Sequence, residues 1–136
     1  MLTRACYAVL LLALAIGCGQ PSPTTRPAPA PSTPKPPQTA EQLNGRLEAA
    51  LKMTNHAQQH EALKAVAEDA ASASAAEIVT KALDAMDNHA LRNEVAADCA
   101  LRIAKRGDPK SAATVAERIS NRAQRDDVLS KIAKGG

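Results

Sequence analysis

The sequence predicts an all-α protein: a short α-solenoid of three 33-residue helix-hairpin repeats, six helices in all, after a disordered N-terminal region. Three observations predict this architecture. Residues 39–136 repeat themselves at a period of 33, apolar residues within the copies recur at helical spacing, and residues that commonly cap helices precede the apolar stretches. The residues before the repeats contain eight of the nine prolines and an apolar N-terminal run.

The 33-residue period is visible in five sets of equivalent residues. Each set places an apolar residue, an Asn or an Ala at the same point of all three units. The sets are Met53, Met86 and Ile119; Asn55, Asn88 and Asn121; Ala57, Ala90 and Ala123; Val66, Cys99 and Ile132; and Ala67, Ala100 and Ala133. Repeats of this length are typical of helical arrays, in which each unit buries its apolar face against the next.

The second helix of each unit is predicted from its apolar spacing. In the first two units apolar residues recur at i, i+1, i+4, i+5 and i+8, beginning at Ala62 and at Val95, which places them on one face of a helix. Thr54, Asp87 and Ser120 precede these helices and are predicted as their N-caps, because a side-chain oxygen there can accept a hydrogen bond from a free backbone N–H group.

The first helix of each unit is predicted from its start signal. The signals are capping-box spacings in Thr39 with Gln42 and in Ser74 with Glu77, and a cap followed by proline in Asp108 and Pro109. The six helices are therefore expected near residues 40–53, 55–72, 75–86, 88–106, 109–119 and 121–134. Residues 40–136 contain 24 Ala against 19 Leu, Ile, Val and Met, so we expect a thin core.

Residues 39–136 resemble the tetratricopeptide-like family of helix-hairpin repeats. The turn Gly-Asp-Pro-Lys-Ser-Ala at residues 107–112 is similar to that family's turn, and Ala67, Ala100 and Ala133 fall where the family has a small residue between paired helices. The family's aromatic positions are Ala or aliphatic here, and its period is one residue longer. The resemblance implies a right-handed superhelix used for protein–protein contact, and it carries over no ligand-binding residue.

The N-terminus has the pattern of an export signal. Arg4 precedes an uncharged apolar run over residues 5–16, which is too short to span a bilayer and suits the core of a signal peptide. The run ends at Ala15, Ile16, Gly17 and Cys18, which resemble the lipobox of bacterial lipoproteins, although Ala15 stands where that family usually has Leu.

The resemblance to bacterial lipoproteins implies a signal peptide over residues 1–17 and lipid attachment at Cys18, with acyl chains such as palmitate. Two or more acyl chains form a stable membrane anchor. Gly19 is not the Asp that retains enterobacterial lipoproteins in the inner membrane, so we expect the cell envelope, and the outer membrane of a cell with two. Ordinary signal-peptide cleavage after Gly17 is the alternative.

A proline-rich linker follows the cysteine. Residues 18–38 contain eight prolines among Ser, Thr and Ala, with no apolar pattern to bury. Such a composition predicts a disordered tether of polyproline character between the membrane and the repeats at 39–136. A proline-rich recognition motif around Lys35 is the alternative.

The charge distribution excludes a nucleic-acid binder and leaves other partners open. The net charge of +3 comes from Arg4, Arg26 and Lys35, residues 39–136 are neutral, and only 1% of the chain is aromatic. Within the repeats, residues 40–91 carry 4 basic and 8 acidic side chains, and residues 92–136 carry 10 basic and 6 acidic.

This uneven distribution of charge has two functional interpretations. The alternative to both is a solvated surface with weak ion pairs. The first is a partner-binding surface around Arg118, Arg122 and Arg125, since Arg is enriched at interfaces. The second is weak self-association, in which the acidic end of one molecule contacts the basic end of another.

Metal and thiol chemistry have little support. His56 and His60 are four residues apart and His89 is the equivalent of His56, so these three are the candidate ligands of a metal site. The third unit has Arg122 at that point, which favours solvated residues at helix starts. Cys99 is the equivalent of apolar residues in the other units, so we expect a buried, inert thiol.

The sequence nominates no catalytic residue and no cofactor, and we expect no enzyme. The predicted function is protein–protein interaction with an unidentified envelope protein, as a membrane-anchored adaptor or assembly factor. The alternatives are a small-ligand or metal-binding lipoprotein that uses His56, His60 and His89, and a passive structural lipoprotein.

Overall fold

The computed structural model describes residues 38–135, which form six α-helices and no strand. The helices are α1 (Ala40–Leu51), α2 (His56–Ser72), α3 (Ala76–Asp84), α4 (His89–Lys105), α5 (Pro109–Ala116) and α6 (Arg122–Ala133). The all-helical class and the six predicted helices are confirmed. The predicted signal peptide, Cys18 and all of the linker except residue 38 lie outside the described residues.

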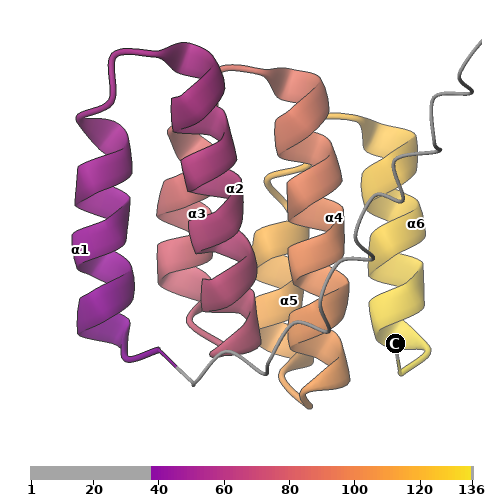
Figure 1. Ribbon diagram of the computed structural model, residues 1–136. Coiled ribbons are helices and arrows are strands. Elements are labelled where there is room, and N and C mark those ends of the chain that lie inside the picture. The colour runs from indigo at the N-terminus through magenta and orange to yellow at the C-terminus, as the bar shows by residue number, and fades with distance from the viewer. Residues whose placement is uncertain (1–37, 136) are drawn as a thin grey trace, which may run out of the picture. The chain divides into compact units, whose positions relative to one another are not determined.

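The helices stack as a two-layered array of hairpins. α2, α4 and α6 lie side by side in one row, α3 and α5 form a second row behind it, and α1 contacts both α2 and α3 at the N-terminal end (Figure 1). α1 and α6 therefore occupy opposite ends of the array. Each unit contacts its neighbour in both rows, which is how a repeat protein builds a continuous core.

The core is apolar and composed largely of small residues. Among residues 38–135 all 24 buried side chains are hydrophobic, nine of them are Ala, and none is polar or charged. They form one cluster that runs from Leu43 to Ile132, so this part of the chain carries its own core. The bulk comes from aliphatic side chains such as Leu63, Leu83 and Ile103, which are 0% exposed.

Successive units are joined by the same left-handed turn. The backbone φ is 56° at Ser74 and 89° at Gly107, and these residues are 33 positions apart. In both turns the next residue donates its N–H group back to the helix, from Ala75 to the carbonyl of Ala70 at 2.8 Å and from Asp108 to an equivalent carbonyl at 3.4 Å. This arrangement is a Schellman motif, which satisfies the last carbonyls of α2 and α4.

The predicted capping box at Ser74 is wrong for this reason. Ser74 belongs to the end of α2, and the N-cap of α3 is Ala75, whose side chain makes no capping hydrogen bond. The predicted caps of the other first helices are confirmed. Thr39 and Gln42 form a reciprocal capping box, and the Asp108 carboxylate accepts from Ser111 N–H at 3.0 Å.

The predicted N-caps of the second helices are wrong by one residue. Asn55, Asn88 and Asn121 hold the N-cap position, and each side-chain oxygen accepts a hydrogen bond from a backbone N–H in the first helical turn. Thr54, Asp87 and Ser120 precede them. All three units use Asn because its short side chain reaches the free N–H groups from an extended backbone.

The first unit differs from the others at its outer edge. Met86 and Ile119 are 1% and 0% exposed, whereas Met53 at the equivalent position is 41% exposed. Met86 and Ile119 precede residues that hydrogen-bond to the preceding unit, and no unit precedes Met53 within residues 38–135. Leu51, close to Met53, is 48% exposed.

Candidate interaction groove

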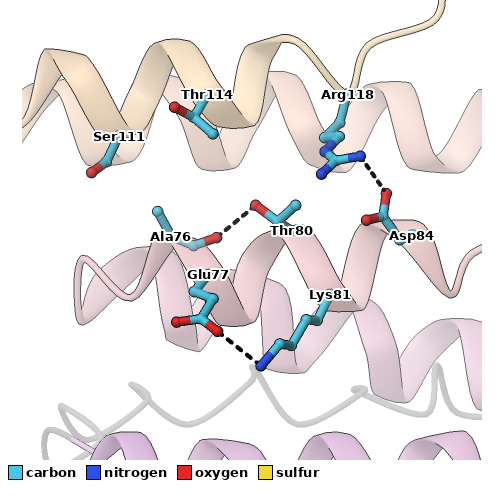
Figure 2. A pocket seen from close by; sticks show the side chains of 8 residues that line it. All are labelled: Ala76, Glu77, Thr80, Lys81, Asp84, Ser111, Thr114 and Arg118. Carbon is cyan, nitrogen blue, oxygen red and sulfur yellow. Dashed lines mark hydrogen bonds and ion pairs between the residues drawn. The ribbon is translucent and has the colours of Figure 1, made fainter.

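A groove runs between α3 and α5 (Figure 2). Its volume is about 450 Å³, and the side chains that line it are mostly polar. The lining residues are Ala76, Glu77, Thr80, Lys81 and Asp84 of α3, Ser111 and Thr114 of α5, and Arg118 after α5. α3 packs on α2 and α5 packs on α4, and polar side chains of both helices line the groove.

The charged residues of the groove form two ion pairs. Arg118 Nη1 lies 3.2 Å from Asp84 Oδ1 and joins the ends of α5 and α3. Lys81 Nζ lies 3.0 Å from Glu77 Oε1, one helical turn apart. All four side chains are 44% exposed or more, and ion pairs in that setting contribute little to stability. The same groups can therefore exchange one partner for another at small cost.

The threonine hydroxyls of the groove are bonded to their own helices. Thr80 Oγ1 donates to the carbonyl of Ala76 at 2.8 Å, and Thr114 Oγ1 donates to the carbonyl of Lys110 at 3.2 Å. Their methyl groups remain as part of the groove surface.

A second groove of about 370 Å³ adjoins the first. It is lined by residues of α1, of the turn before α3 and of α3 itself, and it shares Ala76, Glu77, Lys81 and Ser111 with the first groove. The two hollows together extend across the flank formed by α1, α3 and α5. We refer to this surface as the first-helix face.

The three Arg residues nominated from the charge pattern occupy different settings. Arg118 lines the groove, and Arg122 is exposed at the start of α6. Arg125 is half-buried at the position equivalent to Gln59, whose Nε2 donates to two carbonyls in the last turn of α1. Sequence reasoning missed Asp84, the ion-pair partner of Arg118, because nothing in the chain marks a contact between the ends of α3 and α5.

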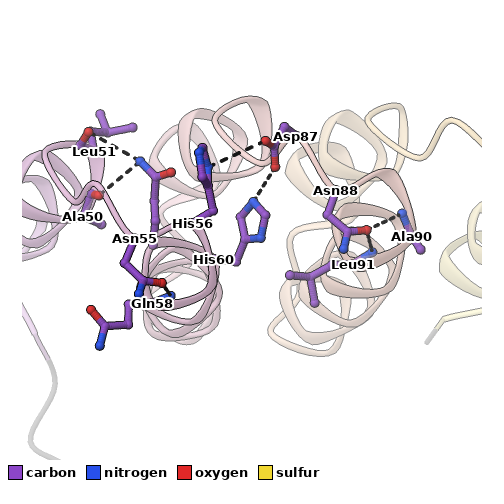
Figure 3. Close-up of polar contacts among 11 residues, drawn as sticks. Ala50, Leu51, Asn55, His56, Gln58, His60, Asp87, Asn88, Ala90 and Leu91 are labelled. Atoms are coloured by element: carbon purple, nitrogen blue, oxygen red, sulfur yellow. Dashed lines mark hydrogen bonds and ion pairs between the residues drawn. The ribbon is translucent and has the colours of Figure 1, made fainter.

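Two of the three histidines share one carboxylate (Figure 3). His60 Nε2 lies 2.5 Å from Asp87 Oδ1, and His56 Nδ1 lies 4.0 Å from Asp87 Oδ2. The hydrogen bond from His60 and the nearby charges of His60 and His56 hold the pKa of Asp87 below its ordinary value of 3.8. Asp87, predicted as an N-cap, instead connects the loop before α4 to α2.

The third histidine does not join this group. His89 Nδ1 accepts from Arg92 Nη2 at 2.8 Å, within the first turn of α4. Across residues 38–135 no group of three or more His, Cys, Asp or Glu side chains is arranged to hold a metal ion. The structure thus brings two candidate ligands together and leaves the third apart.

Cys99 lies in the core, as its repeat position predicts. It is 0% exposed, and burial, with a smaller contribution from the Asp98 charge, raises the pKa of its thiol from 9.0 to about 12. A thiol with such a pKa is almost entirely protonated at neutral pH and is a poor nucleophile.

Comparison of the chain with protein-family models, with curated proteins and with solved structures finds no match. Within residues 38–135, no helix combines the length and the apolar character that a membrane span requires.

Proposed function

We propose that the protein is an envelope lipoprotein, anchored by a lipid on Cys18, whose tetratricopeptide-like repeats bind another envelope protein through the first-helix face. The anchor is supported by the apolar run of residues 5–16 and by the lipobox-like residues that end at Cys18. In this proposal the proline-rich residues 18–38 act as a tether that separates the repeats from the membrane.

The observation that carries the binding proposal is the pair of adjoining grooves, about 450 and 370 Å³, along one face of the array. Hollow surfaces on solenoids are where such proteins bind extended partners. The lining offers two ion pairs, Lys81 with Glu77 and Arg118 with Asp84, and the side chains of Thr80 and Thr114. A partner segment with alternating polar and small apolar side chains suits that lining.

Site-specific photocrosslinking in cells tests this function. A photoreactive residue at exposed Thr114 would probe the groove, and the same residue at Ala65, which is exposed on α2, would serve as a matched control. We expect one envelope protein to crosslink at residue 114 and not at residue 65. The captured protein, once purified, should bind the wild-type chain, and Arg118→Glu should weaken that binding about tenfold or more.

Two further variants separate the parts of the proposal. Cys18→Ser should release the chain from the membrane fraction and reduce capture, whereas it should leave binding between purified proteins unchanged. Arg122→Glu and Arg125→Glu test whether α6 contributes to the same surface. Equal crosslinking at residues 65 and 114, or none at either, would overturn the adaptor proposal and favour a passive structural lipoprotein.

A further inference from the structure

The two ends of the helical array complement each other. We propose that molecules of this protein associate head to tail, so that α1 of one copy docks on the C-terminal face of another and continues the 33-residue repeat across the contact. This inference concerns the ends of the array and is independent of the partner proposed for the first-helix face.

The C-terminal face is an apolar groove at the end of the array, in the space where a fourth unit would begin. Its volume is about 580 Å³. Apart from backbone groups it is lined by aliphatic carbon, and its side chains include Ala104, Ala113, Leu129, Ile132 and Ala133. Within the described residues, no further helix packs over this opening.

The equivalent residues of the middle unit show what fills such a groove. Ala96, Cys99 and Ala100 are each 0% exposed, because α5 of the following unit packs against α4. Their equivalents in the last unit are Leu129, which is half-buried, Ile132, which is 7% exposed, and Ala133, which is exposed. Within residues 38–135 no further helix packs on the last unit in the way that α5 packs on α4.

The opposite end of the array also exposes apolar side chains. Met86 follows α3 and Ile119 follows α5, and both are buried at the junction with the preceding unit. Met53 holds the equivalent position after α1. Leu51 and Met53 are the large hydrophobic residues that are exposed among residues 38–135, at 48% and 41%. Both lie at the end of α1, next to Thr54, so this end of the array exposes apolar side chains at the position where Met86 and Ile119 are buried between units.

The two ends of the array also carry the equivalents of two residues that form a polar contact between neighbouring units. At the middle junction, Asn93 Oδ1 accepts hydrogen bonds from the N–H of Ser120 at 2.9 Å and from its hydroxyl at 3.0 Å. At the first junction, His60 donates to Asp87 over the same 27-residue separation (Figure 3).

The equivalents of Asn93 and Ser120 at the open ends are Asp126 and Thr54, which are both exposed. A carboxylate oxygen on Asp126 and a hydroxyl on Thr54 are the same acceptor and donor types as at the middle junction. A head-to-tail contact in the repeat register would therefore bring Asp126 of one copy to the Thr54 hydroxyl and N–H of the next.

Long-range charge favours the same orientation. Residues 40–91 carry 4 basic and 8 acidic side chains, whereas residues 92–136 carry 10 basic and 6 acidic. The acidic half of one copy then approaches the basic half of another, which assists association, and two like ends repel. Because the contact joins different surfaces, it can propagate into chains of copies and is not limited to a dimer.

Thiol crosslinking in membranes that contain the full-length chain tests the proposal. A chain that carries both Thr54→Cys and Asp126→Cys should form a ladder of dimers, trimers and larger species with a short bifunctional thiol reagent. A mixture of the two single variants should stop at dimers, and each single variant alone should resemble the wild type, which controls for the other cysteines. An Asn93→Cys and Ser120→Cys pair should crosslink within one chain and shows that the reagent spans this junction.

A surface variant provides the second arm. Met53→Glu should abolish the ladder, because it places a charge in the contact beside Thr54, where the equivalent Met86 and Ile119 are buried, and the fold should survive because Met53 is already exposed in a single molecule. Ala90→Glu, at an exposed position of the middle unit, should leave the ladder intact.

The proposal is overturned if the double variant gives no intermolecular product while the internal pair reacts. It is also overturned if Thr54→Cys alone forms dimers as readily as the mixture does, since that result indicates a symmetric contact between like ends. Binding of a different envelope protein at the first-helix face would be unaffected by either result.

Discussion

Ser74 and Gly107 occupy the same left-handed turn one repeat apart, with φ values of 56° and 89°. A non-glycine residue in this region carries a cost of about 1–2 kcal/mol from contact between its Cβ and the backbone. The turn at Ser74 carries that cost, and the turn at Gly107 does not. The difference predicts opposite effects for reciprocal substitutions.

We expect Ser74→Gly to raise the free energy of unfolding by about 1 kcal/mol and Gly107→Ala to lower it by a similar amount. Urea titration of residues 38–136, followed by circular dichroism, measures both. Gly45→Ala is the matched control, because Gly45 lies in the interior of α1. An added Cβ meets no atom within 4 Å at Gly45 or at Gly107. Gly45→Ala should raise stability by about 0.5–1 kcal/mol. Equal effects of Ala at the two glycines would show that φ is not the cause.

The two methionines at equivalent positions predict a second contrast. Met86→Ala should lower the free energy of unfolding by about 2–5 kcal/mol, because it empties a site that is 1% exposed. Met53→Ala should change it by less than about 0.5 kcal/mol in dilute solution, because Met53 is 41% exposed in a single molecule. Losses of similar size would contradict the end position assigned to Met53.

The sequence supports prediction of the helices better than prediction of their boundaries. The repeat and the apolar spacing locate all six helices, because both depend on burial that recurs at a fixed period. The predicted N-caps, Thr54 and its equivalents, lie one residue early, since Thr, Asp and Ser are all good caps. The identity of Asn55, Asn88 and Asn121 in every unit was the better signal.

Contacts between units were less accessible to sequence reasoning. The pairing of Arg118 with Asp84 depends on how the ends of two helices approach each other, which no local pattern specifies. The histidines illustrate the same point. His56 and His89 are equivalent in the repeat, yet one lies near a carboxylate of the next unit and the other pairs with its own helix.

The Asp87 carboxylate predicts a loss of stability in acid. Its pKa is lowered in the folded protein by the His60 hydrogen bond, so its contribution is fully present above the ordinary value of 3.8 and disappears as the pH falls through the lowered value. Asp87→Asn should therefore reduce the free energy of unfolding at neutral pH, by less than Met86→Ala does, and should have little effect in strong acid.

Urea unfolding of wild type and Asp87→Asn at several pH values measures this difference. Asp127→Asn is a suitable control, since Asp127 pairs with Lys131 within one exposed helical turn and joins no two units. A gap between wild type and Asp87→Asn that persists unchanged below the lowered pKa would contradict a role for the carboxylate charge.

The burial of Cys99 predicts a thiol that reacts only when the array unfolds. With its pKa raised to about 12, the thiolate is scarce at neutral pH, and the side chain is 0% exposed. In the protein of residues 38–136, where Cys99 is the single cysteine, maleimide labelling should be negligible in buffer and should follow the unfolding curve in urea.

Cys99→Val, which copies Val66 of the first unit, should alter stability by less than about 1.5 kcal/mol. Cys99→Ser should cost about 1–3 kcal/mol, because it buries a hydroxyl among apolar side chains. Rapid labelling of the folded protein, or equal stability of the Val and Ser variants, would show that this position opens to solvent and that the junction between α4 and α5 is looser than its packing indicates.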